Sequence, residues 1–198
     1  MTLQPADAET HSCLTGRPVL AQELGLNRRR PDVLGRIGTL ETRLARNAAE
    51  VDAAQRLRYR VFVEEMKATL SPEARMSRRD FDRFDDICDH LVVVDTALDG
   101  DGEDQIIGTY RLLRQDVARR NGGFYSACEF DIDTLLDRNP GKRFMELGRS
   151  CVLPEYRTRR TVELLWQGNW AYALKHDIVV MFGCASFPGA IPEEHAMA

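Results

Sequence analysis

The sequence predicts one α/β or α+β domain in which helices flank a mixed β-sheet. Segments rich in branched and aromatic residues recur along the chain and alternate with two segments of helical periodicity. A chain of 198 residues has the length of a single domain. Strands interleaved with covering helices in this order favour a sheet that is mixed rather than wholly parallel.

The first part of the chain predicts a flexible leader over residues 1–36. It combines prolines and glycines with Arg28–Arg30 and shows no sustained period. The ordered domain is expected over residues 37–198. Alternating apolar and polar residues predict its first strand over Gly38–Arg46.

A long helix is predicted next, from about Ala48 to Met66. Asn47 followed three residues later by Glu50 is typical of a helix N-terminus, and apolar residues then recur at helical spacing. The segment Lys67–Asp80 lacks periodicity and is expected to be a loop that leads to an acidic edge.

The middle of the chain predicts a β-hairpin. His90–Ala97 and Ile106–Arg114 are rich in β-branched and aromatic residues and flank the turn-forming segment Asp99–Asp104. A short helix is expected over Phe130–Arg138, after a loop that contains two adjacent glycines.

The last predicted elements are a strand, a helix and a strand: Phe144–Pro154, about Arg160–His176, and Ile178–Phe187. Periodicity gives the helix an apolar stripe, to which Leu165 contributes. The residues of this stripe are Val162, Trp166, Trp170 and Ala173.

Composition excludes several classes of protein. The net charge of −4 provides no general attraction to nucleic acid or to an anionic membrane, so any such contact must be made by a local basic patch. Five cysteines without a Cys-x-x-Cys pair suggest neither a disulfide framework nor a metal cluster, and Cys151 and Cys184 in apolar runs are typical of small buried hydrophobic residues. The sequence shows no signal peptide and no apolar segment of spanning length. We therefore expect a cytoplasmic protein.

Three groups of residues suggest chemistry: Arg58 one helical turn from Phe62, the aspartates Asp82 and Asp85, and the segment Glu146–Arg149 within an apolar strand. The two-residue strand period places Glu146 and Arg149 on opposite sides. Each group has a structural alternative. Arg58 is equally explained as a surface residue packed on Phe62, the aspartates as a solvated loop, and Glu146 with Arg149 as a buried structural pair.

These residues carry a resemblance to a known superfamily. Arg58-x-x-x-Phe62, Asp82-x-x-Asp85, Arg111 and Glu146-Leu-Gly-Arg149 resemble the acyl-homoserine lactone synthases, which are GNAT-like N-acyltransferases. Those synthases usually have Ser at the position of Gly148. The longer stretches IGTYRLLRQDVARRNGGFYSACEFDI and FMELGRSCVLPEYRTRRTVELLWQGNWAYAL more closely resemble the bacterial L-ornithine Nα-acyltransferases.

The resemblance implies a GNAT-like fold and a specific reaction. A 3-hydroxyacyl chain would pass from acyl carrier protein to the α-amine of L-ornithine, giving lyso-ornithine lipid, with no metal. The implied catalytic residues are Glu146 and Arg149. Glu146 is either a base, since burial favours the protonated form of a carboxyl group, or an orienting group if an arginine pairs with it. The implied acceptor-binding residues are Arg58, Phe62, Asp82, Asp85 and Arg111.

The donor side departs from the usual GNAT pattern. The glycine-rich phosphate turn is replaced by Arg157-Thr-Arg-Arg-Thr161, which argues against tightly bound coenzyme A and leaves no tightly bound cofactor. Arg157, Arg159, Arg160 and Thr161 are expected to meet the phosphopantetheine and the acidic carrier protein. The residues expected to line an acyl slot are Trp166, Trp170, Phe144 and Phe182.

Two alternatives remain open from the sequence: a lactone synthase, and a non-catalytic module that binds acyl carrier protein or a membrane. An amphiphilic product implies peripheral contact with the inner membrane, to which the leader arginines would add weak attraction. GNAT-like folds continue beyond the strand expected over Ile178–Phe187, so the sequence also predicts a C-terminally truncated domain.

Overall fold

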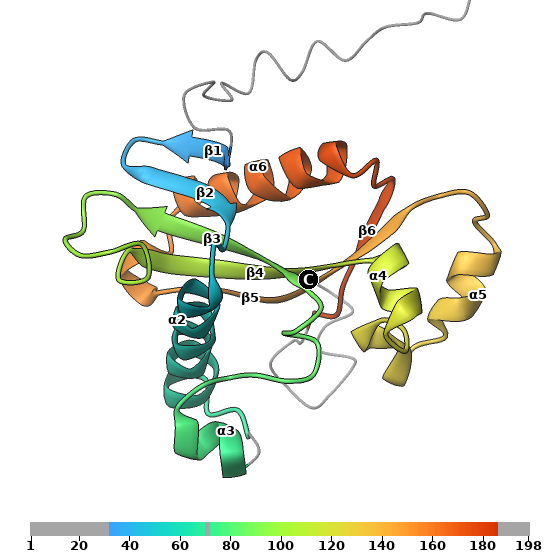
Figure 1. Cartoon of the computed structure of the whole chain (residues 1–198), viewed down its shortest axis with the longest axis horizontal. Coiled ribbons are helices and arrows are strands. Elements are labelled where there is room, and N and C mark those ends of the chain that lie inside the picture. Colours follow the sequence, from blue (N-terminus) through green and yellow to red (C-terminus); the bar gives the residue numbers. More distant parts are fainter. Residues whose placement is uncertain (1–31, 70–71, 186–198) are drawn as a thin grey trace, which may run out of the picture.

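A computed structural model describes residues 32–69 and 72–185, which form one curled six-stranded sheet with helices on both faces (Figure 1). The strands follow the chain order across the sheet. All neighbours are antiparallel except the last two, which are parallel. The strands are β1 (Val33–Ile37), β2 (Leu40–Leu44), β3 (Asp89–Asp95), β4 (Ile106–Arg114), β5 (Phe144–Val152) and β6 (Val180–Phe182).

Two long helices cover opposite faces of the sheet. The helix α2 (Ala48–Arg58) packs mainly on β4, and α6 (Arg159–Lys175) packs mainly on β1 and β2. The strand period explains this division, because Arg43 reaches Glu50 of α2 while its neighbour Thr42 lies against Gly168 of α6. Figure 1 shows the two helices on either side of the sheet.

Short helical segments fill the connections. They are η1 (Tyr59–Glu65), α3 (Pro72–Ser77), α4 (Gln115–Arg120), η2 (Tyr125–Cys128), α5 (Ile132–Asp137) and η3 (Pro154–Tyr156). The segment η1 continues α2 as a π-helix, a widened turn that is frequent at functional sites. The side chain of Asn47 caps α2 by accepting a hydrogen bond from the backbone N–H of Glu50 at 2.9 Å.

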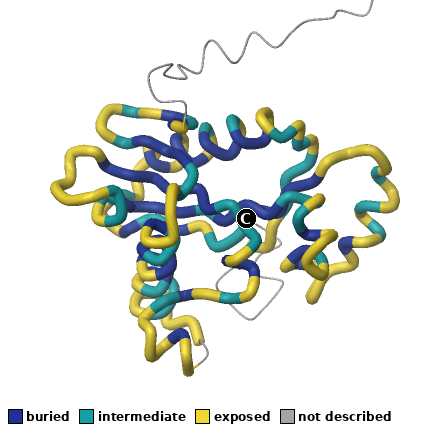
Figure 2. The backbone as a smooth tube through the Cα atoms, in the orientation of Figure 1, coloured by how far each residue is buried: buried dark blue, intermediate teal, exposed yellow. Residues whose placement is uncertain are grey.

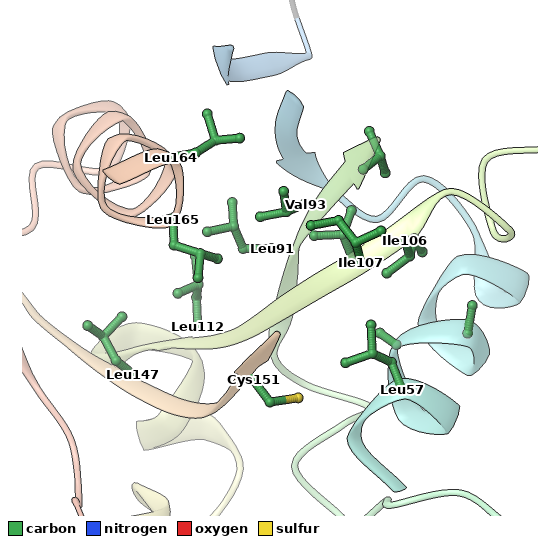
Figure 3. Packing of buried hydrophobic residues seen from close by; sticks show 14 of the residues in the cluster. Leu57, Leu91, Val93, Ile106, Ile107, Leu112, Leu147, Cys151, Leu164 and Leu165 are labelled. Carbon is green, nitrogen blue, oxygen red and sulfur yellow. The ribbon is translucent and has the colours of Figure 1, made fainter. Parts of the chain in front are cut away.

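The main core lies on both sides of the central strands. Leu91 and Val93 of β3 and Leu112 of β4 are fully or almost fully buried, between Leu164 of α6 and Leu57 of α2 (Figure 3). A second cluster, which includes Phe84, Phe124 and Phe144, packs where α4, α5 and η2 meet the sheet. Figure 2 shows burial concentrated along the central strands and exposure at the loops.

The predicted fold class is confirmed, since the sheet is mixed and flanked by helices. The predicted elements correspond to β2, to α2 with η1, and to β3, β4, α5, β5, α6 and β6. Two details differ. Four of the five residues of β1 lie in the segment assigned to the leader, where Gly35 interrupts the strand pattern, and α3 occupies part of the expected loop. Arg28–Arg30 and residues 186–198 lie outside the described residues.

The residues of the apolar stripe predicted for α6 lie on two faces of the helix, since Ala173 and Leu165 are buried whereas the other three are exposed. Val162, Trp166 and Trp170 are 51%, 52% and 45% exposed, whereas Leu164 and Tyr172 are fully buried. A helix that is apolar on two sides provides two stripes at the same period, and periodicity alone does not distinguish them.

Candidate functional site

The site is organised around Arg58, the last residue of α2, whose side chain is only 1% exposed. Its Nε donates to Asp80 Oδ2 at 2.8 Å and its Nη2 to Asp85 Oδ1 at 2.7 Å. Nη2 also contacts the carbonyl oxygen of Asp80. Both the aliphatic part of Arg58 and its guanidinium group are thus buried. The alternative that Arg58 is a surface residue packed on Phe62 is therefore wrong.

Asp80 was not identified from the sequence, although it connects three segments. Its backbone N–H donates to Gln55 O of α2 at 3.1 Å, and its carboxylate binds both Arg58 and Arg149. The residue is 5% exposed. Asp80 ends an irregular segment next to Arg78 and Arg79, so the available signal was an acid within a basic run.

Asp85 is the acceptor at the centre of the site. Its two oxygens receive Arg58 Nη2, the Asp82 N–H at 2.9 Å and Arg111 Nη1 at 3.2 Å. Burial raises the pKa of Asp85, but Arg58, the Asp82 N–H and Arg111 together outweigh burial, so its pKa lies below the usual value. Asp85 therefore remains a carboxylate that holds two guanidinium groups in place.

Arg111 extends from β4 between Asp82 and Asp85, with a 2.7 Å contact to Asp82 Oδ1. Its guanidinium carbon also lies 5.7 Å from the ring centroid of Phe84 and 5.9 Å from that of Tyr125. The side chain is 4% exposed. Carboxylates and aromatic faces therefore fix the orientation of this guanidinium.

A β-bulge in β5 brings Arg149 to the same pocket as Glu146. The register with β4 shifts between Thr109 and Arg111, and Arg149 has a positive φ of 52°. The bulge breaks the two-residue alternation, so the predicted placement on opposite sides is wrong. Arg149 binds Asp80 through Nε at 3.0 Å and stacks 4.2 Å above the ring of Phe62.

Glu146 is saturated by donors from η2 rather than paired with an arginine. Its Oε2 accepts from the Tyr125 N–H at 2.7 Å, and its Oε1 accepts from the Ser126 N–H at 2.8 Å and from the Ser126 hydroxyl. The residue is 4% exposed. Glu146 thus fastens η2 to β5, and the structural alternative of a Glu146–Arg149 pair is wrong.

A pocket of about 640 Å³ opens beside β5. Of the residues predicted for the site, Phe62, Arg111, Glu146 and Arg149 line it. Arg58, Asp82 and Asp85 do not line it but support the lining arginines. The remaining lining residues include apolar and aromatic side chains and one further acid: Met66, Phe84, Cys88, Tyr110, Leu113, Tyr125, Leu147 and Glu129.

Two details of the lining affect its chemistry. A Cβ at Gly148 would meet no atom within 4 Å, so the glycine at the usual serine position leaves open space in the pocket. Burial raises the pKa of Cys88, which also lines the pocket, to about 12. Its thiol is therefore protonated at neutral pH and is a poor nucleophile.

The four residues expected on the donor side do not form one free patch. Arg157 binds both carboxylate oxygens of Glu65 at 2.6 Å, and Arg159 binds Glu163 at 2.8 Å. Thr161 is fully buried and donates to Tyr156 O. Arg160 is exposed at the start of α6.

The residues expected to line an acyl slot do not lie at the pocket. None of Trp166, Trp170, Phe144 and Phe182 lines the pocket at Arg149. Phe144 is 1% exposed, and Phe182 packs edge-on against Phe124 with ring centroids 4.9 Å apart.

Within residues 32–69 and 72–185, no group of three or more His, Cys, Asp and Glu side chains is arranged to hold a metal ion, and no helix has the length and apolarity needed to cross a bilayer.

Comparison with known proteins identifies close relatives of the chain. Residues 57–167 match the model of the acetyltransferase (GNAT) domain. The L-ornithine N(alpha)-acyltransferase of Rhizobium meliloti is 75% identical over 167 residues, which cover 84% of this chain and 56% of that protein. The proteins of the same name from Agrobacterium fabrum and Brucella abortus are 71% and 58% identical, over 84% and 83% of this chain and 57% and 59% of their own lengths. The chain thus spans somewhat more than half the length of these curated relatives.

Solved structures share the fold at low identity. The N-acyl amino acid synthase FeeM from uncultured soil microbes superimposes with a TM-score of 0.54 and 13% identity, covering 79% of this chain and 74% of its own. The acyl-homoserine lactone synthase LasI gives a TM-score of 0.50 and 15% identity, covering 73% and 71%. At these identities the likeness concerns the fold alone.

Proposed function

The chain belongs to the GNAT acetyltransferase family, and from this premise we propose that it is an N-acyltransferase that acylates the α-amine of L-ornithine. The single observation that supports this most strongly is the 75% identity to an L-ornithine N(alpha)-acyltransferase. A stretch of 167 residues in a chain of 198 necessarily includes residues 32–167, so the pocket arginines and their carboxylate partners lie within the match.

The pocket offers groups that are complementary to an amino acid with a second amine. Arg111 and Arg149 present guanidinium groups that suit the α-carboxylate of the acceptor. Asp82 and Asp85 bind arginines, so their role in this proposal is to orient those arginines rather than to receive ammonium groups. Glu129, an exposed acid at the pocket, is the proposed partner of the side-chain ammonium.

We assign Glu146 a positioning role. Three donors from Tyr125 and Ser126 already occupy its carboxylate, and its contacts hold η2 against the pocket wall. Arg149 is the proposed catalytic-site cation because it is 28% exposed, lines the pocket and is fixed by Asp80 and Phe62. The reaction needs a neutral α-amine, which attacks the thioester carbonyl while the developing oxyanion is stabilised by hydrogen-bond donors of the site.

The proposed donor is a 3-hydroxyacyl thioester of acyl carrier protein, and the proposed product is lyso-ornithine lipid. Parallel β5 and β6 pair only over Phe144–Glu146 and Val180–Phe182, so within the described residues no strand pairs with the later part of β5 on that side. Val152 O accepts there from Arg157 Nε at 3.0 Å, and the backbone between Leu147 and Val152 is the part proposed to meet a pantetheine arm. Arg160 and the terminal part of Arg159 are the exposed cations at the start of α6 for the carrier protein, while Arg157 and Thr161 stabilise the local structure.

Transfer of a 3-hydroxyacyl chain tests the proposal directly. The chain is incubated with a 3-hydroxyacyl thioester of either acyl carrier protein or coenzyme A, together with either L-ornithine or S-adenosylmethionine, and products are identified by mass spectrometry. We expect an Nα-acylated ornithine and release of the free carrier thiol. Product formed only with S-adenosylmethionine, or only with acyl-coenzyme A as donor, would contradict the proposed acceptor or donor. The product is an amphiphile, and we therefore propose peripheral contact of this cytoplasmic enzyme with the inner membrane.

A further inference from the structure

The outer face of α6 carries an exposed line of apolar side chains, here called the α6 stripe. Its members are half exposed: Val162 51%, Trp166 52%, Trp170 45% and Leu174 45%. A spacing of four residues places them on one side of the helix, one above the other. Val179, 67% exposed, follows soon after the helix ends.

The stripe is not needed for packing α6 onto the sheet. Leu164, Leu165 and Tyr172 already fill the inner face, with exposures of 0%, 6% and 0%. A helix at the surface of a water-soluble domain normally has a polar outer face. The chain has only two tryptophans, and both lie in this stripe. Tryptophan is enriched at membrane–water interfaces because its ring is apolar and its N–H is a donor.

Charges around the stripe favour an anionic surface. Arg159 and Arg160 begin the helix, Lys175 ends it, and the side chain of Arg159 is 92% exposed. Beyond the helix, Arg143, with a side chain 64% exposed, contacts His176 O at the helix end. Two acids lie among them: Glu163 pairs with Arg159, and Asp177 lies 3.2 Å from Arg143 Nη1. The four cations still outnumber these two acids. Basic residues that flank an apolar stripe on a helix are the pattern of interfacial helices that bind anionic lipid.

We propose that the α6 stripe is a docking surface for an anionic lipid bilayer, with Trp166 and Trp170 inserted at the interface. The inference rests on the proposed function, whose product is an amphiphile. The stripe faces away from the sheet on the side opposite α2, whereas Phe62 of η1, which continues α2, lines the pocket. Docking through the stripe therefore leaves the pocket open to ornithine.

Intrinsic fluorescence tests the proposal, because both tryptophans report from the stripe. The full chain is titrated with vesicles of phosphatidylcholine alone and with vesicles of equal parts phosphatidylcholine and phosphatidylglycerol. We expect a blue shift of the emission and quenching by acyl-chain-brominated lipid with the anionic vesicles only. Cosedimentation of the Trp166→Ser/Trp170→Ser variant should fall by at least about tenfold, since two large apolar side chains no longer enter the interface.

Met76→Ser is the matched control, since Met76 is an exposed apolar residue of α3, 87% exposed and remote from α6. It should bind vesicles like the wild type. Lys175→Gln should weaken binding at low salt. The proposal is overturned if tryptophan emission is blue-shifted without vesicles and insensitive to acrylamide, which means that another segment covers the stripe. It is equally overturned if the emission depends on protein concentration, as a second copy would cause, or if the double variant still binds.

Vesicle-free acyl transfer separates this inference from the proposed function. The Trp166→Ser/Trp170→Ser variant should retain the wild-type rate with soluble carrier and ornithine, because neither tryptophan lines the pocket. Failure of the wild type to transfer an acyl chain contradicts the proposed function. Loss of transfer in the double variant alone, with an unchanged unfolding midpoint, contradicts the assignment of the stripe to membrane contact.

Discussion

At the scale of single residues, the site consists of arginines held by aspartates. Arg58, Arg111 and Arg149 were recognised from the sequence because they occur in recognisable motifs, but their partner Asp80 was not. Charge pairing across 22 and 69 residues depends on how the loop folds against α2 and β5, which local patterns do not encode. The residue types of the site were thus predictable, whereas their pairings were not.

Asp80→Asn should lower the free energy of unfolding by about 3 kcal/mol, because it leaves Arg58 and Arg149 with one fewer negative partner in a buried site. Guanidinium chloride unfolding measures the loss. Asp116→Asn is the matched control, since Asp116 pairs with Arg120 at the surface with a side chain 57% exposed, and its loss should cost less than about 1 kcal/mol. Equal effects of the two variants would show that Asp80 does not hold the network.

Glu146→Gln should lower stability by about 1–3 kcal/mol, because an amide cannot accept from all three donors of η2. If Glu146 positions η2, the rate of acyl transfer falls but the shape of its pH profile is retained. If Glu146 is instead the base, stability falls by the same amount but the acidic limb of the profile disappears. Glu155→Gln, at an exposed residue, provides the control for both measurements.

Glu129→Gln should raise KM for L-ornithine by about fivefold with little change in kcat, as expected for loss of one partly solvated ion pair. Nδ-acetyl-ornithine, whose side chain carries no charge, serves as the control acceptor because it offers no side-chain ammonium to residue 129. Its KM should be the same for the variant and the wild type. A similar rise in KM for both acceptors would mean that Glu129 does not recognise the side-chain ammonium.

At the scale of elements, the sequence located strands and helices better than it located their faces. The periods of β2, β3, β4 and β5 gave the correct strands, but the bulge at Arg149 reversed the side expected for one key residue. In α6 the more conspicuous apolar stripe, with two tryptophans, is the outer one. The position of a bulge, and the choice of the inner face of a helix that is apolar on two sides, both depend on tertiary packing. The periodicity of the sequence does not contain this information.

Gly168 allows α6 to lie close to β2. A Cβ there would lie 2.8 Å from Thr42 Oγ1 and 2.9 Å from Thr42 Cγ2. Gly168→Ala should therefore lower stability by about 1–2 kcal/mol, despite the higher helix propensity of alanine. Gly148→Ala is the matched control, since its Cβ would meet nothing within 4 Å. An increase in the unfolding midpoint of Gly168→Ala would contradict the close contact between α6 and β2.

At the scale of the whole molecule, the buried charges fasten α2, the 80–86 segment, β4 and β5 around one pocket. The pocket therefore depends on the protonation state of the groups beneath it. Two of these groups, Asp85 and His90, have lowered pKa values, and each therefore contributes stability that is lost as the pH falls. The pKa of Asp85 is lowered because its arginines and the Asp82 N–H outweigh burial, and the pKa of His90 is lowered chiefly by burial.

Acid should destabilise the fold in two steps. His90 Nε2 lies 2.9 Å from Asp85 O, and the ring is neutral in the folded protein. Below its ordinary pKa of 6.5 only the unfolded state readily takes up this proton, so stability present above that pH is lost as pH falls toward the lowered folded pKa. The contribution of Asp85 persists to lower pH and is lost as pH falls below 3.8 through its own lowered pKa.

The urea midpoint should therefore fall between about pH 7 and pH 5, and His90→Gln should flatten this fall because it removes the buried group that protonates. His176→Gln is the comparison variant. Burial and Arg114 also lower the pKa of His176, but this residue is only partly buried beside Arg114 Nη1, so its removal should flatten the profile less. A profile unchanged by His90→Gln would place the acid-sensitive group elsewhere, and a greater effect of His176→Gln would place it at the end of α6.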